Sequence, residues 1–173
     1  MRRPELNAAI RVAKGIQESV NAVLGPPSET RAPPQQPVLP HALFLKTKGY
    51  IEKIVFQVNA SYTATCYDAC AVMVRRLVEV LIIEVYECHG KGAAIKDADG
   101  NYFFLERLVT RIISQDDWAL GRETKKSLKR LKSIGDLSAH SRHYNAHRQY
   151  IEDEIQGLRA ACEDLLYHAG LKT

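Results

Sequence analysis

The feature that most restricts the fold is the lack of proline in the more than 130 residues that follow Pro40. Proline removes a backbone donor and clashes inside a helix, so a long run without it permits long helices. Apolar residues in this run recur three and four positions apart, which is the period of an amphipathic helix. The sequence therefore predicts an all-α bundle, whose helices we expect to end at glycines such as Gly90, Gly135 and Gly170.

The spacing of apolar residues also gives the approximate helices. The segment 69–83 is apolar nearly all round, which predicts a buried central helix. From Ile151 to Ala169 the apolar residues are spaced alternately four and three apart, as in the seam of a bundle or coiled coil. Asn101 is expected to cap the helix that follows it. We expect helices at about residues 47–59, 61–89, 102–116, 123–134 and 147–169.

The N-terminal part differs in composition. Residues 3–24 carry apolar side chains at helical spacing and predict an amphipathic helix. Residues 25–40 hold six prolines and only two large aliphatic side chains, typical of a stiff, extended linker. We therefore expect an N-terminal helix (1–24), a proline-rich linker (25–40) and a helical domain (41–173). The first helix could pack on its own domain or on a partner subunit.

Composition excludes several classes of protein. The chain has no apolar run of about 18 residues, so no membrane span is expected. The first residues lack the apolar segment of a secretory signal. Four scattered cysteines lack the grouping of a zinc site and are interpreted as reduced, small core residues of a cytoplasmic protein.

Positive charge is concentrated in one region. The net charge is +4, but residues 122–148 hold eight Lys and Arg side chains against two acids, Glu123 and Asp136. A local basic region can attract phosphate groups, and it can equally be a solvated helix face. The candidate RNA-binding residues in it are Lys125, Lys129, Arg130 and Lys132.

Three of the six histidines lie between Lys132 and His147. Asp136 precedes His140 by four residues, so on a helix its carboxylate could orient the imidazole and raise its pKa. Asp136 also follows a glycine expected to end a helix, so it could instead be an N-cap beside a packed histidine. Both interpretations stay open.

Arg142 and His147 form a second pair, five residues apart. Metal-independent RNA cleavage requires this combination, because a histidine can move a proton at the 2′-hydroxyl while a guanidinium neutralises the phosphorane. These two residues and His140 are the candidate catalytic residues.

Four polar side chains interrupt the predicted central helix within an arc of about 100°: Asp68, Arg75, Arg76 and Glu79. They could form an ion pair at the edge of the core, for which Arg75 and Glu79 have the right spacing. Alternatively, Arg76 and Glu79 support a site by facing the stretch from Lys132 to His147. Asp68 is better explained by structure alone.

The sequence lacks the motifs of the common nucleotide-binding, zinc-protease and serine-hydrolase sites. The sequence has no phosphate-binding P-loop, no dinucleotide fingerprint, no His-Glu-x-x-His and no nucleophile elbow. A calcium loop starting at Asp97 fails, because Tyr102 and Leu108 stand where glycine and glutamate are needed. We therefore expect no nucleotide cofactor, no metal and no other cofactor.

Two segments resemble a known family. Residues 62–79 read Tyr-Thr-Ala-Thr-Cys-Tyr-Asp-Ala-Cys-Ala-Val-Met-Val-Arg-Arg-Leu-Val-Glu, and residues 135–140 read Gly-Asp-Leu-Ser-Ala-His. In order and spacing they resemble the DUF4145 family, which has Leu/Val-Arg-Arg-x-x-Glu and, downstream, Gly-Asn/Asp-x-x-Ala-His. The resemblance covers about residues 50–170. It implies a domain similar to the HEPN group, whose members are small α-helical domains that often dimerise, cleave or bind RNA, and act in prokaryotic defence or toxin systems.

The HEPN motif of arginine, a polar residue and a later histidine fits the chain in two registers. Laid directly on the sequence, it falls on Arg142, His143 and His147. Laid on the DUF4145 pattern, the histidine is His140 and the polar residue is Asp136, but Lys132 stands nearest the place of the arginine. The resemblance thus implies an RNA-directed module, with metal-independent ribonuclease activity in one register. The alternative is a non-catalytic dimerisation or regulatory domain.

Overall fold

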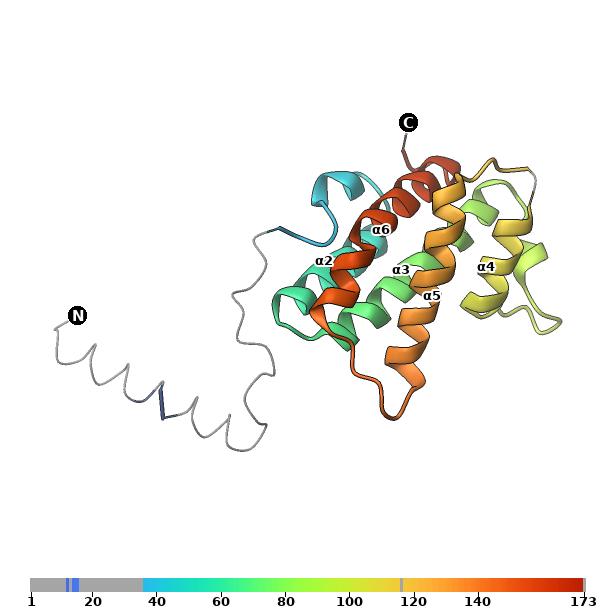
Figure 1. The fold of residues 1–173 in the computed structure, drawn as a ribbon. Coiled ribbons are helices and arrows are strands. Elements are labelled where there is room, and N and C mark those ends of the chain that lie inside the picture. Colours follow the sequence, from blue (N-terminus) through green and yellow to red (C-terminus); the bar gives the residue numbers. More distant parts are fainter. Residues whose placement is uncertain (1–11, 13, 16–35, 116, 173) are drawn as a thin grey trace. The chain divides into compact units, whose positions relative to one another are not determined.

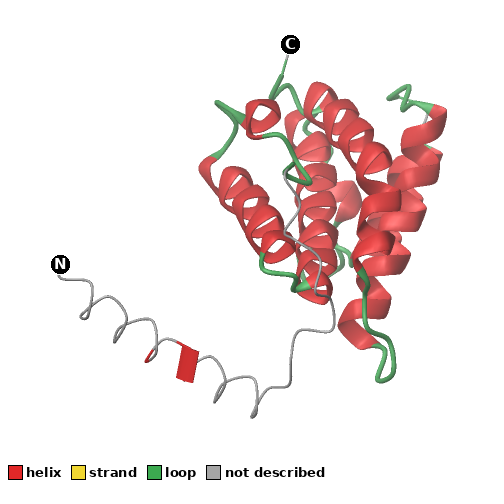
Figure 2. Ribbon diagram, turned by 60° about the vertical axis from the view of Figure 1, so that its left-hand side comes forward, coloured by secondary structure: helices red, strands yellow, loops and turns green. Residues whose placement is uncertain are grey.

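The computed structural model describes residues 12, 14–15, 36–115 and 117–172, and all structural statements below refer to them. Within this part the chain forms a bundle of five α-helices with two short 3₁₀ turns, η1 (His41–Phe44) and η2 (Gly92–Ile95). The described residues contain no β-strand, only an isolated bridge between Lys96 and Tyr102, so the all-α prediction is confirmed (Figure 2). The helices are α2 (Gly49–Thr63), α3 (Tyr67–Cys88), α4 (Leu105–Ser114), α5 (Arg122–His140) and α6 (Arg148–His168).

The central helix is α3. It contacts each of the other four helices, and Figure 1 shows it between α2 and α4, with α5 and α6 crossing in front. Its side chains Leu77, Leu81, Ile82 and Val85 are completely buried. This confirms the prediction made from its apolar composition, because a helix that is apolar nearly all round must be covered on all sides.

The last helix also matches its prediction. Along α6, Ile151, Leu158, Cys162 and Leu165 are buried, and the helix packs against α3 and α5 of the same chain. Its apolar seam is therefore used inside the bundle. None of the described helices is long and apolar enough to cross a lipid bilayer.

The break between α2 and α3 lies later than predicted. We expected it near residue 60, but α2 continues to Thr63 and a short turn follows, in which Thr65 has a φ of +60°. Tyr62 explains the extra turn, because its side chain is buried and its ring packs edge-to-face on Tyr67 at 5.7 Å. Tertiary packing thus sets the end of α2.

The folded domain begins before residue 41. Val38 and Leu39 are completely buried, and both backbone groups of Leu39 are hydrogen-bonded by the side-chain amide of Asn59 on α2. Arg159 on α6 donates to the carbonyl oxygens of Pro37 and Val38, at 2.7 and 2.9 Å. Of the predicted N-terminal helix, Val12, Lys14 and Gly15 are described and are helical. The rest of that helix and the linker up to residue 35 lie outside the described residues.

The predicted end of α5 at Gly135 is wrong. The helix runs through this glycine to His140, and Asp136 is therefore a residue of the helix interior and no N-cap. Instead, the glycine allows α3 and α5 to pack closely where they cross, because a Cβ added to it would lie 2.6 Å from Cβ of Arg75 on α3. Similarly, a Cβ on Gly157 of α6 would lie 2.4 Å from Oγ of Ser127 on α5.

The connection between α3 and α4 corrects one further expectation. Asn101 does not cap a helix, because α4 begins only at Leu105. Instead, the carboxylate of Asp97 accepts hydrogen bonds from the backbone N–H groups of Asp99 and Asn101. The Asp97 side chain therefore closes a turn in this connection.

Candidate functional site

One exposed face of α5 carries most of the basic side chains. Its residues recur three and four positions apart, so at 100° per residue they fall within about 100° of arc. At 1.5 Å per residue the face extends over about 27 Å. We call it the α5 stripe, and all of its side chains are exposed: Arg122, Lys126, Lys129, Arg130, Ser133, Leu137 and His140.

The basic residues of α5 differ in how far their charge is neutralised. Arg130 forms an ion pair with Glu154 of α6 at 3.1 Å, and Lys126 pairs with Glu123 at 2.9 Å. Arg122, Lys125 and Lys129 form no ion pair within the described residues. Of the four predicted RNA-binding residues, Lys125 and Lys129 are thus available to an external anion, whereas Arg130 and Lys132 already have carboxylate partners.

Lys132 belongs to an ion-pair network that joins three helices. It lies 3.0 Å from Asp136 and 3.4 Å from Glu106 of α4, while Nε of Arg75 donates to Asp136 at 2.8 Å. Arg75 also pairs with Glu79 at 3.4 Å. Arg75 of α3 thus makes the ion pair with Glu79 for which the sequence has the right spacing, and it also contacts Asp136 in the segment after Lys132.

The network determines the charge state of Asp136. Burial alone would raise the pKa of this carboxyl, but hydrogen bonds from Arg75 and Lys132 outweigh burial and hold the pKa below its ordinary value. The hydrogen bond to Asp136 raises the pKa of Lys132. Asp136 is thus a carboxylate with two cationic partners, and its oxygens are occupied.

His140 lies apart from this network. It is exposed at the end of the α5 stripe, and within the described residues no hydrogen bond joins it to Asp136. Both residues are on α5 one turn apart, but Asp136 turns towards Arg75 on α3. Arg76, predicted as a supporting residue, is exposed, and its neighbour Arg75 makes the contact instead. Gly135 was the available signal, since it marks where Arg75 crosses α5.

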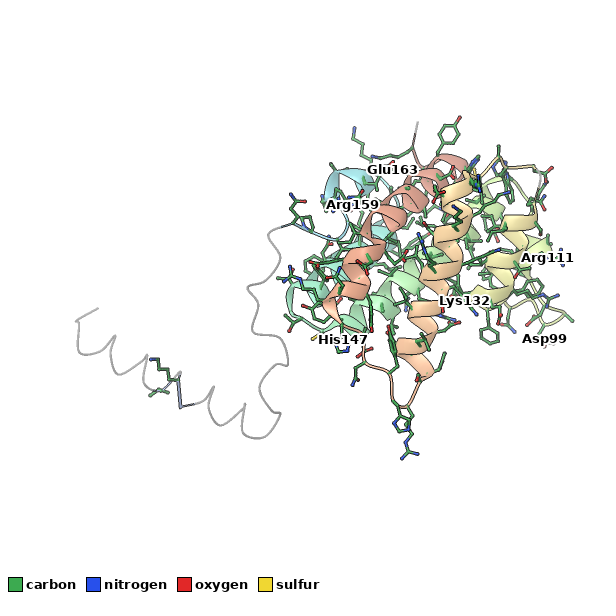
Figure 3. All side chains as sticks on the ribbon, viewed as in Figure 1. Asp99, Arg111, Lys132, His147, Arg159 and Glu163 are labelled. Atoms are coloured by element: carbon green, nitrogen blue, oxygen red, sulfur yellow. The ribbon has the colours of Figure 1, made fainter. Side chains whose placement is uncertain are left out.

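The loop from Ser141 to His147 carries the remaining candidate residues. Arg142 and His143 are exposed in it, and His147 is exposed at the N-cap of α6. Figure 3 shows His147 at this end of α6 and Lys132 on α5. The loop is tied to α3 by Asp68, whose carboxylate accepts a hydrogen bond from the backbone of Ala146 at 2.9 Å. Asp68 therefore has the structural role expected of it.

Aromatic rings border the same loop. Tyr144 stacks on Tyr150 of α6, with ring centroids 6.2 Å apart and planes at 16°, and the His147 ring meets Tyr150 edge-on at 5.5 Å. Tyr150 is exposed to 44%. The loop thus combines imidazole, guanidinium and aromatic groups at the end of the basic stripe.

A second polar cluster next to this loop was not predicted. Glu152 accepts hydrogen bonds from the Tyr62 hydroxyl at 2.9 Å and from Nε of Arg148 at 2.8 Å. Burial, reinforced by the Glu152 carboxylate, raises the pKa of Tyr62 to about 12. The cluster lines an open groove of about 340 Å³ that also contains Arg159. The i, i+4 spacing of Arg148 and Glu152 was the sequence signal for it.

The described residues contain no group of three His, Cys, Asp or Glu side chains that could hold a metal ion. Of the four cysteines predicted to be core residues, Cys70 and Cys162 are buried, whereas the prediction is wrong for Cys66 and Cys88, which are exposed. Burial raises the pKa of the Cys70 thiol to about 12. No family model, curated protein or solved structure matches the chain.

Proposed function

We propose that the domain is an RNA-directed module of the HEPN-like type, in which the α5 stripe binds the phosphate backbone. The observation that carries the proposal is the order of side chains on one exposed face. Arg122, Lys126, Lys129 and Arg130 occupy its first part, and the face leads to His140 and the loop. A nucleic acid carries condensed counterions around its phosphates. When an array of cations along a helix neutralises those phosphates, the counterions are released, which drives association with any nucleic acid.

RNA cleavage is the reaction that these residues could support at the loop. A histidine, His147 or His140, would accept the proton of a ribose 2′-hydroxyl as its oxygen attacks the adjacent phosphorus. The P–O5′ bond would break to leave a 2′,3′-cyclic phosphate, the protonated histidine would return its proton to the leaving 5′ oxygen, and Arg142 would neutralise the extra negative charge. Because Asp136 is occupied by Arg75 and Lys132, the pair Arg142–His147 is favoured over Asp136–His140.

The test of cleavage compares variants on structured RNA in EDTA. We expect the wild type to produce fragments. His147→Ala or Arg142→Ala should lower the cleavage rate by at least about tenfold, a conservative threshold because general acid–base catalysis usually contributes more than this. His140→Ala tests the second register. His41→Ala is the matched control, because His41 is an exposed histidine on η1. Identical RNA profiles for all of these proteins would contradict ribonuclease activity. RNA binding would then remain as the proposed function.

The second candidate function is a non-catalytic dimerisation or regulatory module. The closed network of Arg75, Asp136 and Lys132 favours it, because this part of the DUF4145-like pattern then serves helix packing. The α6 seam is covered within the chain, so a dimer would form through another face. A dimer in sedimentation equilibrium together with no retention of RNA would support this candidate over the first.

A further inference from the structure

An open groove of about 460 Å³ lies between α4 and α5, directly beside the α5 stripe. Lys129 and Ser133 belong both to the stripe and to the groove wall. A ligand lying along the stripe could therefore reach into the groove without leaving its phosphate contacts. The volume is within the range of small-molecule sites, about 300–1,000 Å³.

The α4 side of the groove combines apolar and polar groups. Val109 is buried, and Ile113 packs against the core as well, so the two side chains provide an apolar surface. The flat face of a nucleic-acid base can pack on an apolar surface, as extruded bases do against apolar side chains in enzyme pockets.

The two hydroxyl groups of α4 in the groove both donate to carbonyl oxygens of their own helix. Thr110 donates its hydroxyl proton to the carbonyl oxygen of Glu106 at 2.9 Å, and Ser114 donates to that of Arg111 at 3.1 Å. A hydroxyl has one proton, so while each of these groups makes this bond its oxygen lone pairs can accept a hydrogen bond from a ligand. One helical turn separates the two acceptors.

The α5 wall supplies the complementary charge. Lys129 has no ion-pair partner within the described residues, while Lys132 is held by Asp136 and Glu106. Lys129 is therefore the cation available to a phosphate at the edge of the groove. A phosphate on Lys129 would leave the attached nucleoside next to the acceptors of α4.

We propose that this groove holds one base of an RNA strand bound along the α5 stripe, and that it prefers bases with an exocyclic amino group over uracil. The proposal rests on the RNA-directed function. Adenine and cytosine offer an amino group with two N–H donors, which matches the acceptor pair Thr110 and Ser114. Uracil has one N–H on its pairing edge, between two carbonyl oxygens that would face the hydroxyl oxygens.

The experiment measures affinity of the full chain for oligoadenylate, oligocytidylate and oligouridylate of about 12 nucleotides, by fluorescence anisotropy. We expect the first two to bind roughly five- to tenfold more tightly than oligouridylate, as one to two net hydrogen bonds imply. The double variant Thr110→Val, Ser114→Ala should reduce the affinity for those two to that of oligouridylate. Ser61→Ala is the matched control, since Ser61 donates to Gln57 in the same way on α2.

A second variant tests the groove from the other wall. Ser133→Phe would fill it, and should remove the preference while the affinity for oligouridylate is kept. Thr110, Ser114 and Ser133 are all exposed, so these variants should stay folded, which circular dichroism checks. If the oligomers bind but both variants keep the preference, the groove proposal is overturned and the RNA-directed function stands. If none of the oligomers binds, the RNA-directed function fails and the groove proposal with it.

Discussion

At the scale of single residues, Gly135 decides how closely α3 and α5 approach. A methyl group on it would lie 2.6 Å from Cβ of Arg75, an atom fixed to the backbone of α3. We predict that Gly135→Ala destabilises the fold by about 1–3 kcal/mol in urea denaturation, because the helices must separate. This outcome opposes helix propensity, which favours alanine by about 1 kcal/mol.

Gly49→Ala is the control for that prediction. Gly49 begins α2, and no atom lies within 4 Å of the position of an added Cβ. We expect this variant to be at least as stable as the wild type. Equal stability of the two variants would mean that the crossing has room for a methyl group.

The contribution of Asp136 to the stability of the fold should depend on pH. Folding lowers its pKa, so its carboxylate stabilises the fold fully above the ordinary value of 3.8 and loses this contribution as the pH falls through the lower folded pKa. Asp136→Asn should cost about 1–3 kcal/mol near pH 7. The difference from the wild type should shrink as the pH falls below that ordinary value. Asp99→Asn is the matched control, because Asp99 is an exposed turn residue.

At the scale of elements, α5 illustrates how much the sequence could predict. Its helical period and basic face were readable, because they are local properties of the chain. Its length was not, because Gly135 resembles a helix end unless Arg75 is known to pass next to it. The site was also hard to predict, because its contacts are not all local. The spacing of Asp136 and His140 indicates a pair, but the Asp136 carboxylate is bound by Arg75 of α3 and by Lys132, which lies one turn earlier on α5.

The α5 stripe also yields a prediction as an element. Lys126→Glu combined with Lys129→Glu should weaken RNA binding, and the salt dependence of the binding constant should flatten by about 0.7 in logarithmic slope for each phosphate that is no longer neutralised. Lys46→Glu with Lys53→Glu changes the net charge equally but on exposed positions before and within α2. If both double variants bind RNA equally weakly, total charge and not the α5 stripe controls binding.

At the scale of the whole molecule, residues 37–39 close the bundle between α2 and α6. The sequence already contained a signal for this, since Val38 and Leu39 are the two large aliphatic residues of the proline-rich segment. The proline content of the segment nevertheless predicts a linker here. Val38 and Leu39 are held in place by Arg159 and Asn59, which are far away in the sequence. The composition of the segment cannot reveal these partners.

This closure can be tested at Asn59. Asn59→Ala removes the partner of both backbone groups of Leu39, and leaving buried groups unpaired should cost about 1–3 kcal/mol. We expect a lower melting temperature and faster hydrogen exchange at the Leu39 amide. Gln57→Ala, at an exposed position of the same helix, should change neither. Unchanged exchange at Leu39 in the Asn59 variant would contradict the closure.

The two hydrogen bonds of Arg159 have a consequence for biosynthesis. They join residues 121 and 122 positions apart, so the earliest part of the domain to leave the ribosome is fastened by one of the last. Until α6 emerges, Val38 and Leu39 lack part of their covering and the nascent chain exposes apolar surface. The domain therefore completes its folding after translation of α6, and a ribosome stalled before Arg159 should carry a chain that proteases cut near residue 38.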